Sequence, residues 1–223
     1  MRYLVRCLFL APILIATPLI AQAPSRLLAA QLGRDEANAL LAFYPSSDVA
    51  HSRSAAAVIK LTIAPNGKVI ACDLIDQIGH AGLAERICGF SKRVKWSSAR
   101  DRDGHAAFGI ATTIVKFAIP GTPQGESVQQ AQREPDVIAK LAAANSLPGG
   151  SADVKVSLQI GPTANIIACE PSVPTGSSLT SQACSVAEKL KFDVLNGPGN
   201  APVGYVTERI IRLVADGADP QPR

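Results

Sequence analysis

The sequence has few of the side chains on which enzymes depend. Aromatic residues make up 4% of the chain, and there are only three histidines, His51, His80 and His105. Each histidine stands in a predicted loop, and no two have the spacing of metal ligands. The chain has no Gly-x-Ser-x-Gly nucleophile elbow, and no phosphate-binding lysine follows Gly149-Gly150. We therefore expect a non-enzymatic protein with no catalytic residues, no metal and no cofactor.

Long runs of one charge are missing as well. Lys92-Arg93 is the longest basic cluster, and the formal net charge is only +4. Proteins that bind nucleic acids usually carry a dense basic patch that neutralises phosphates. We therefore exclude nucleic acid as a partner and expect the isolated charges to lie on solvated faces.

A long apolar run occurs only at the start of the chain. Two arginines there precede the apolar residues 8–20, which is the arrangement of a secretory signal peptide. We assign residues 1–23 to this signal, with cleavage after Ala21 or after Ala23. The alternative is an uncleaved membrane anchor, because residues 3–21 are just long enough to span a bilayer. Both interpretations predict export, and the first predicts a periplasmic or secreted protein.

An internal repeat is the most informative pattern in the sequence. With an offset of 97 residues, segment 57–65 aligns with 154–162, and segment 69–73 aligns with 166–170. After the loss of one residue the alignment continues, and it makes three further pairs equivalent: Cys88 with Cys184, Trp96 with Phe192, and Thr113 with Arg209. Because four separate blocks agree, the chain is predicted to hold two degenerate copies of one unit.

Each copy is predicted to form two strands, a helix and a long third strand. Residues 59–63 alternate between apolar and polar, which is the period of a strand with one buried face. Asn66-Gly67 then supplies a hairpin turn. The helix carries an apolar stripe at spacings of three and four, formed by Leu83, Ile87, Phe90 and Val94. The expected fold class is α+β, with two tandem ββαβ units, each a three-stranded antiparallel sheet with one helix packed on one face.

Breaks in these patterns divide the chain into parts. The first unit covers residues 24–120 with its core at 55–119, a linker covers 121–150, the second unit covers 151–215, and a tail covers 216–223. Within the linker, Val137, Ile138 and Leu141 predict an amphipathic helix over 128–144. A similar helix is predicted over 34–43, before the first unit.

Four cysteines remain once Cys7, which lies in the signal segment, is set aside. An even number in an exported chain favours disulfides, and the repeat selects the pairs Cys72–Cys88 and Cys169–Cys184. Each bridge would close a loop of about 17 residues, worth ~3 kcal/mol of stability. A zinc site is disfavoured because no two cysteines lie two to four residues apart. Asp73 and Glu170 recur beside the cysteines and are interpreted as polar residues at a strand end.

The order of these motifs resembles the C-terminal domain of the TonB family, the periplasmic energy transducers of Gram-negative bacteria. The first copy carries Tyr44-Pro45, Pro65-Asn66-Gly67, Gly79, Leu83 and Trp96 in the family's order; the second carries Pro162, Gly176, Leu179, Phe192 and Pro202-Val203. The family's membrane-anchored helix and its long proline-rich spacer have no counterpart in this sequence. The resemblance therefore implies a receptor-binding module without the machinery that drives transport.

The resemblance and the long final strands together predict a periplasmic protein-binding module with an exposed edge strand. Such an edge accepts an extended segment through backbone hydrogen bonds. The expected contact strip lies on residues 203–214 and comprises Tyr205, Thr207, Glu208, Arg209 and Arg212. The expected partner is another envelope protein or a peptide segment, and the resemblance points to an outer-membrane receptor.

Other arrangements and functions remain open at this stage. The final strands of the two units could pair with each other, within one chain or in a homodimer, which would leave no edge for a partner. An envelope hydrolase or an inhibitor-like accessory protein would instead gather reactive groups in one cleft. An anchored transducer for outer-membrane transport would require the N-terminal segment to stay uncleaved.

Overall fold

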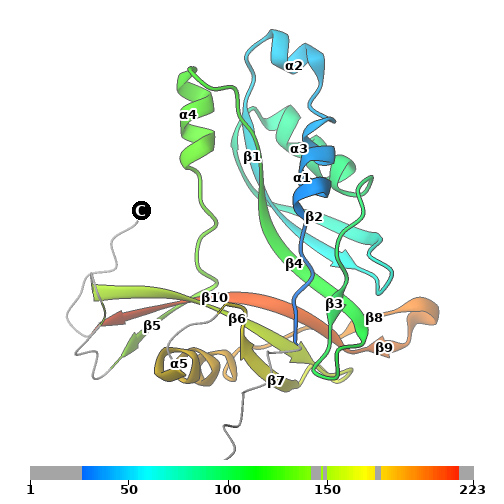
Figure 1. Cartoon of the computed structure of the whole chain (residues 1–223), viewed down its shortest axis with the longest axis vertical. Coiled ribbons are helices and arrows are strands. Elements are labelled where there is room, and N and C mark those ends of the chain that lie inside the picture. The colour runs from blue at the N-terminus through cyan, green and yellow to red at the C-terminus, as the bar shows by residue number, and fades with distance from the viewer. Residues whose placement is uncertain (1–26, 142–146, 148–149, 174–176, 216–223) are drawn as a thin grey trace, which may run out of the picture.

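The computed structural model describes residues 27–141, 147, 150–173 and 177–215. The predicted signal peptide and the tail from residue 216 lie outside these residues. The described chain is an α+β fold with one large mixed sheet, in which the main strands follow the order β2-β1-β4-β10-β6-β7 (Figure 1). Two further strands, β3 and β5, pair with β4 and β10 and bring the sheet to eight strands.

The first half of the sheet is antiparallel and carries helix α3. Its elements are β1 (Ala55–Ile63), β2 (Val69–Gly79), α3 (Ala81–Ser91), β3 (Ala99–Arg100) and β4 (Ala106–Phe117). The predicted hairpin turn between β1 and β2 is present, and Gly67 there takes a φ of +81°. A Cβ at this glycine would lie 2.2 Å from the carbonyl oxygen of Trp96, so both the φ angle and the close approach require glycine.

Two helices precede β1. The first, α1 (Arg34–Leu41), confirms the helix predicted over 34–43, and α2 (Ser46–Ala50) is a short helix that follows Pro45. Between them, the ring of Tyr44 packs 4.8 Å from the ring of Phe117, and its hydroxyl donates a hydrogen bond to the backbone oxygen of Arg53. The Tyr-Pro element therefore fastens the chain before β1 to the end of β4.

The second half repeats the arrangement with helix α5. Its elements are β6 (Ser151–Ile160), β7 (Ile166–Pro171), α5 (Ser177–Ala187), β8 (Leu195–Asn196), the 3₁₀ helix η2 (Pro198–Asn200), β9 (Pro202–Val203) and β10 (Tyr205–Ala215). In the β6–β7 turn, Ala164 occupies the position equivalent to Gly67 and takes a φ of +63°. A side chain is disfavoured at such a φ angle, so this turn is strained where the first turn is not.

The segment between the halves differs from the prediction. The helix expected over 128–144 is wrong: α4 spans Pro123–Gln130, and β5 spans Val137–Leu141. The helix begins earlier because Thr122 caps it, accepting a hydrogen bond from the amide of Gly125 at 3.0 Å, and Pro123 suits the first helical position. Pro135 cannot continue a helix, and the chain after it pairs with β10 as a strand.

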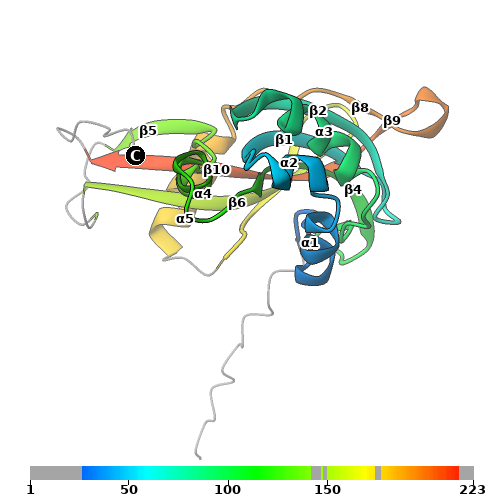
Figure 2. The same ribbon diagram turned by 90° about the horizontal axis from the view of Figure 1, so that it is seen from above.

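A short parallel seam joins the two halves. β4 and β10 start side by side over Phe108–Ile110 and Tyr205–Thr207 and then diverge, as Figure 1 shows. Where β4 leaves, β5 takes its place beside β10 at Ile211–Ala215, so that this part of β10 runs between β5 and β6 (Figure 2). Eight of the described strands therefore form one continuous sheet in place of the two three-stranded sheets expected from the sequence, and β8 and β9 form a separate pair.

The two helices α3 and α5 cover opposite faces of this sheet. Ile59, Leu61 and Phe117 form a core with α3, whereas Val156, Leu158 and Ile211 form a core with α5. At the seam each half contributes a side chain to the other core: Val206 of β10 lies in the first, and Ile110 of β4 lies in the second. Burial of an aliphatic side chain contributes about 2 kcal/mol, so this exchange fastens the halves together.

Candidate functional site

The final strand β10, which the sequence presents as a free edge, lies inside the sheet. It pairs with β6 from Tyr205 to Val214, and on its other side with β4 and then with β5. Tyr205 and Thr207 are buried, with 3% and 0% of their surface exposed. The expectation of an edge at β10 is therefore wrong, because strands of the same chain already occupy both of its sides. The pairing of the two final strands, which the sequence left open as an alternative, is what the structure contains.

The five side chains of the expected contact strip have other surroundings. The Tyr205 hydroxyl donates to the backbone oxygen of Asp193 at 3.0 Å, and burial raises the pKa of Tyr205 despite the opposing effect of Arg209. Thr207 has no hydrogen-bond partner for its hydroxyl in the described part of the chain. Tyr205 and Thr207 therefore belong to the interior of the sheet.

The three charged residues of that strip form ion pairs within the chain. Arg212 binds Asp153 through two hydrogen bonds of 2.7 and 2.9 Å, Glu208 lies 4.0 Å from Lys155, and Arg209 lies 3.6 Å from Asp136. The Arg209 guanidinium also stacks 5.5 Å from the centre of the Phe192 ring. These charges fix β10 to its neighbours and leave little for a partner.

A cavity of about 330 Å³ lies where β4 and β10 diverge. Its polar lining includes Lys155, Ser157, Ser172 and Glu208, and its apolar lining includes Leu28, Leu32 and Trp96. The Ser157 hydroxyl oxygen lies 2.9 Å from that of Ser172, and no histidine lines the cavity. Lys155 lines the same cavity, and its ammonium group lies 4.0 Å from the Glu208 carboxylate, so the polar groups of this lining are paired with one another.

The exposed edge of the first half is β2. Ten of its eleven residues are exposed or half-exposed, and in the described chain β1 is the only strand that pairs with it. Ile70, Leu74, Ile75 and Ile78 are exposed at 47%, 37%, 58% and 38%. An apolar edge strand of this length presents a row of unpaired backbone groups beside apolar side chains. This combination is the strongest candidate for a binding site in the described residues.

Irregular pairing explains why apolar residues of β2 point into solvent. The register skips Ile75 between the pairs Val58–Asp76 and Ile59–Leu74, and it skips Ile70 between Thr62–Ala71 and Ile63–Val69. A skipped residue has no partner opposite it, and the strand bends there. The sequence gives one sign of the irregularity at Ile75, because the two adjacent apolar residues Leu74 and Ile75 break the alternation of the strand. A strand that ended at this point would show the same break.

The second half has two edge strands among the described residues, the five-residue β5 and β7, and β7, the equivalent of β2 in the repeat, is built differently. It has six residues, ends at Pro171 and is half-buried except for Ile167. Ile167 is skipped in the register between Gln159–Ala168 and Ile160–Ile166, so it is the structural equivalent of Ile70. The strand is short, and a proline at its end removes a backbone donor.

Disulfides connect both edges to the helices, as the repeat predicts. Cys72 of β2 bonds to Cys88 of α3, and Cys169 of β7 bonds to Cys184 of α5, with Cα atoms 5.7 and 5.9 Å apart. Each bridge fixes an edge strand at its fourth residue. Disulfides persist in oxidising compartments, which places the chain outside a reducing cytoplasm.

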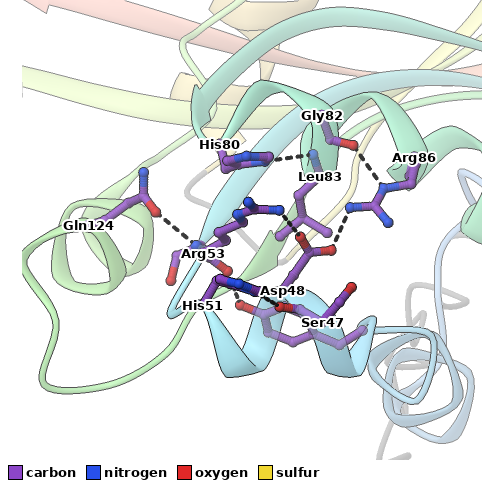
Figure 3. Close-up of polar contacts among 11 residues, drawn as sticks. Ser47, Asp48, His51, Arg53, His80, Gly82, Leu83, Arg86 and Gln124 are labelled. Atoms are coloured by element: carbon purple, nitrogen blue, oxygen red, sulfur yellow. Dashed lines mark hydrogen bonds and ion pairs between the residues drawn. The ribbon is translucent and has the colours of Figure 1, made fainter.

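A buried carboxylate organises the surface near α2. Figure 3 shows Asp48 between the guanidinium groups of Arg53, at 3.3 Å, and Arg86 of α3. Asp48 is 1% exposed, whereas both arginine side chains are more than 40% exposed. His80 caps α3 by accepting a hydrogen bond from the amide of Leu83 at 3.2 Å. Because its carboxylate is enclosed and already paired, this cluster connects α2 to α3 and does not serve as an open site.

The two other histidines also have local partners. His51 bonds through Nδ1 to the backbone oxygen of Ser47 at 2.6 Å, at the end of α2. His105 lies 3.7 Å from Asp101 in the β3–β4 turn, close to Asp103. One carboxylate oxygen of Asp101 already accepts the amides of Asp103 and His105, so this cluster is explained by the turn.

Comparison with models of protein families, with curated proteins and with solved structures finds no significant match. Of the helices that the structure describes, none combines the length and apolarity needed to cross a bilayer.

Proposed function

We propose that the chain is a non-enzymatic periplasmic binding protein, built from two ββαβ units like the C-terminal domain of TonB. It binds an extended segment of another envelope protein by strand addition, at β2 rather than at β10. The TonB resemblance implies an outer-membrane receptor as the partner. The two disulfides support a location in an oxidising compartment.

The exposed outer side of β2 carries this proposal. Strand addition requires a row of free backbone groups, and side chains beside that row provide specificity. Both are available along β2 from Ile70 to Ile78. The disulfide at Cys72 holds the strand against α3, so an incoming segment meets an edge that is already ordered.

The alternative functions have less support. A hydrolase needs a nucleophile and a free base in one cleft, whereas in the cavity beside β10 the two serines bond to each other and Lys155 is paired with Glu208. A transducer would depend on the N-terminal segment, which lies outside the described residues. Binding at an edge requires neither feature.

Photo-crosslinking tests the proposal directly. A photoreactive residue is placed at Ile75 of β2 in the full chain, and a matched one at Ile167 of β7, and each is irradiated in the native cell envelope. We expect an adduct with a discrete envelope protein from position 75 and none from position 167. Peptide mapping should find a single extended segment of the partner attached to β2. Equal adducts at both positions, or none at position 75, would exclude β2 as the binding edge.

A further inference from the structure

Two carboxylates lie on the same face of β2. Cys72 marks the face covered by α3, because it is bonded to that helix, and side chains alternate along a strand. Asp73 pairs with Lys60 of β1 and Asp76 pairs with Val58, and these two β1 residues lie two apart. Residues three apart normally lie on opposite faces of a strand, but Ile75 has no partner on β1 and adds one extra residue between them. Asp73 and Asp76 therefore share the face opposite α3.

Neither carboxylate has a close partner of opposite charge among the described residues. Both residues are exposed, and neither forms an ion pair with a described residue; Asp76 accepts only the amide of Gln77, at 2.8 Å. Lys60 is the cross-strand neighbour of Asp73, yet no ion pair joins them. A strand added outside β2 would therefore place its own side chains beside two unpaired negative charges.

The face of β2 toward α3 has the opposite character. Leu74 is paired with the buried Ile59 and is itself 37% exposed at the rim of the α3 core. A partner residue on this face would extend that core over Leu74 and would remove apolar surface from water. Between Asp73 and Asp76 the two faces of the edge thus call for different side chains in the partner, whereas farther along the strand the apolar Ile78 lies on the same face as Asp76.

On the basis of the proposed function, we infer that the segment bound by β2 alternates basic and apolar residues. Its basic side chains lie beside Asp73 and Asp76, and its apolar side chains lie beside Leu74. Charge also argues against a second copy of this chain as the occupant. Pairing of β2 with itself about a two-fold axis would gather four carboxylates on one face, and like charges opposite each other destabilise a sheet.

Calorimetric titration of the purified, oxidised chain with three short peptides tests this inference. One peptide alternates valine with lysine, and in the others glutamine or glutamate replaces lysine. We expect the lysine peptide to bind about two- to thirtyfold more tightly than the glutamine peptide, with the glutamate peptide weakest, because two opposite-charge pairs would form at the edge. The preference should shrink as salt is raised.

Charge variants of β2 provide the matched control. In Asp73→Asn/Asp76→Asn the advantage of the lysine peptide should disappear, and in Asp73→Lys/Asp76→Lys the glutamate peptide should bind best. Both positions are exposed, so circular dichroism should show unchanged folding. Backbone amide shifts in NMR spectra should place each bound peptide along β2.

The possible outcomes separate this inference from the proposed function. Equal binding of all three peptides along β2 would overturn the basic–apolar preference and leave strand addition standing. Binding of no peptide would overturn both. Self-association of the chain that is lost in Ile75→Lys would identify a second copy as the occupant and would also overturn the inference.

Discussion

β2 and β7 occupy equivalent positions in the sequence repeat, yet they form very different edges. β2 has eleven residues and stays exposed almost throughout, whereas β7 has six, is half-buried and ends at a proline. Both are held by a disulfide to the helix that follows, and both have a skipped isoleucine near their start. The comparison shows that equivalent segments of the repeat form a long, exposed edge strand in one half and a short, half-buried edge strand in the other.

The halves also differ in how their turns and their capping contacts are made. Gly67 adopts the positive φ angle of the first turn without strain, whereas in the second turn Ala164 adopts a positive φ angle although it has a side chain. The Asp48 network binds α2 to α3 in the first half, and the equivalent segment before β6 falls partly outside the described residues. Because the two halves differ at these positions, a substitution in one half can be compared with its counterpart in the other.

The largest effect is expected from removing the disulfides one at a time. The bridged residues are 16 and 15 positions apart, so the loops are nearly equal and each bridge should contribute ~3 kcal/mol. We expect Cys72→Ala/Cys88→Ala and Cys169→Ala/Cys184→Ala to lower the free energy of unfolding by similar amounts, measured by urea denaturation. A much larger loss from one pair would show that the two halves differ in stability, and not only in their edges.

A smaller and opposite pair of effects is expected at the turns. Gly67→Ala should destabilise the chain by about 2 kcal/mol, because the methyl group meets both an unfavourable φ and the Trp96 oxygen. Ala164→Gly should stabilise it by up to ~1 kcal/mol, because the strain at that residue is relieved. Thermal and urea unfolding would measure both, and two changes of the same sign would contradict the assigned turn geometries.

The smallest effect concerns one tyrosine in each half. Burial raises the pKa of Tyr44 and of Tyr205, so the folded state favours the neutral phenol. Stability from this source is complete below the ordinary tyrosine pKa of about 10 and falls as the pH rises from there through the raised folded pKa. Tyr44→Phe and Tyr205→Phe should each make unfolding less sensitive to pH above about 10. An unchanged pH dependence in both variants would contradict this assignment.

Local patterns in the sequence predicted much of the fold. The alternation in residues 59–63 predicted β1, the stripe at Leu83 and Ile87 predicted α3, and the repeat predicted both disulfides. These features depend on neighbours close in the chain or on comparison of the two copies. They were therefore accessible without a structure.

Local sequence patterns do not predict the structure correctly where pairing with distant segments determines the secondary structure or the position of a strand in the sheet. Val137 and Ile138 suit a strand as well as a helix, and pairing with β10 decides between them. Thr122-Pro123 is a recognisable helix start, but the glycines near it favour a loop equally well. The interior position of β10 follows from contacts between the halves, which no pattern within the strand encodes.

The seam between β4 and β10 also has a consequence for the order in which the chain can fold. β1, β2, α3, β3 and β4 are consecutive, so they can assemble as soon as they have been synthesised. β10 follows every other described strand in the sequence but occupies a central place, and it binds β4, β5 and β6. Until β10 emerges, the core around Ile110 lacks Tyr205, Ile211 and Leu213, and the side of β4 that pairs with β10 has no partner there. A partly synthesised or partly exported chain thus exposes an unpaired edge of β4, which can pair with strands of other chains, whereas in the complete fold β10 covers it.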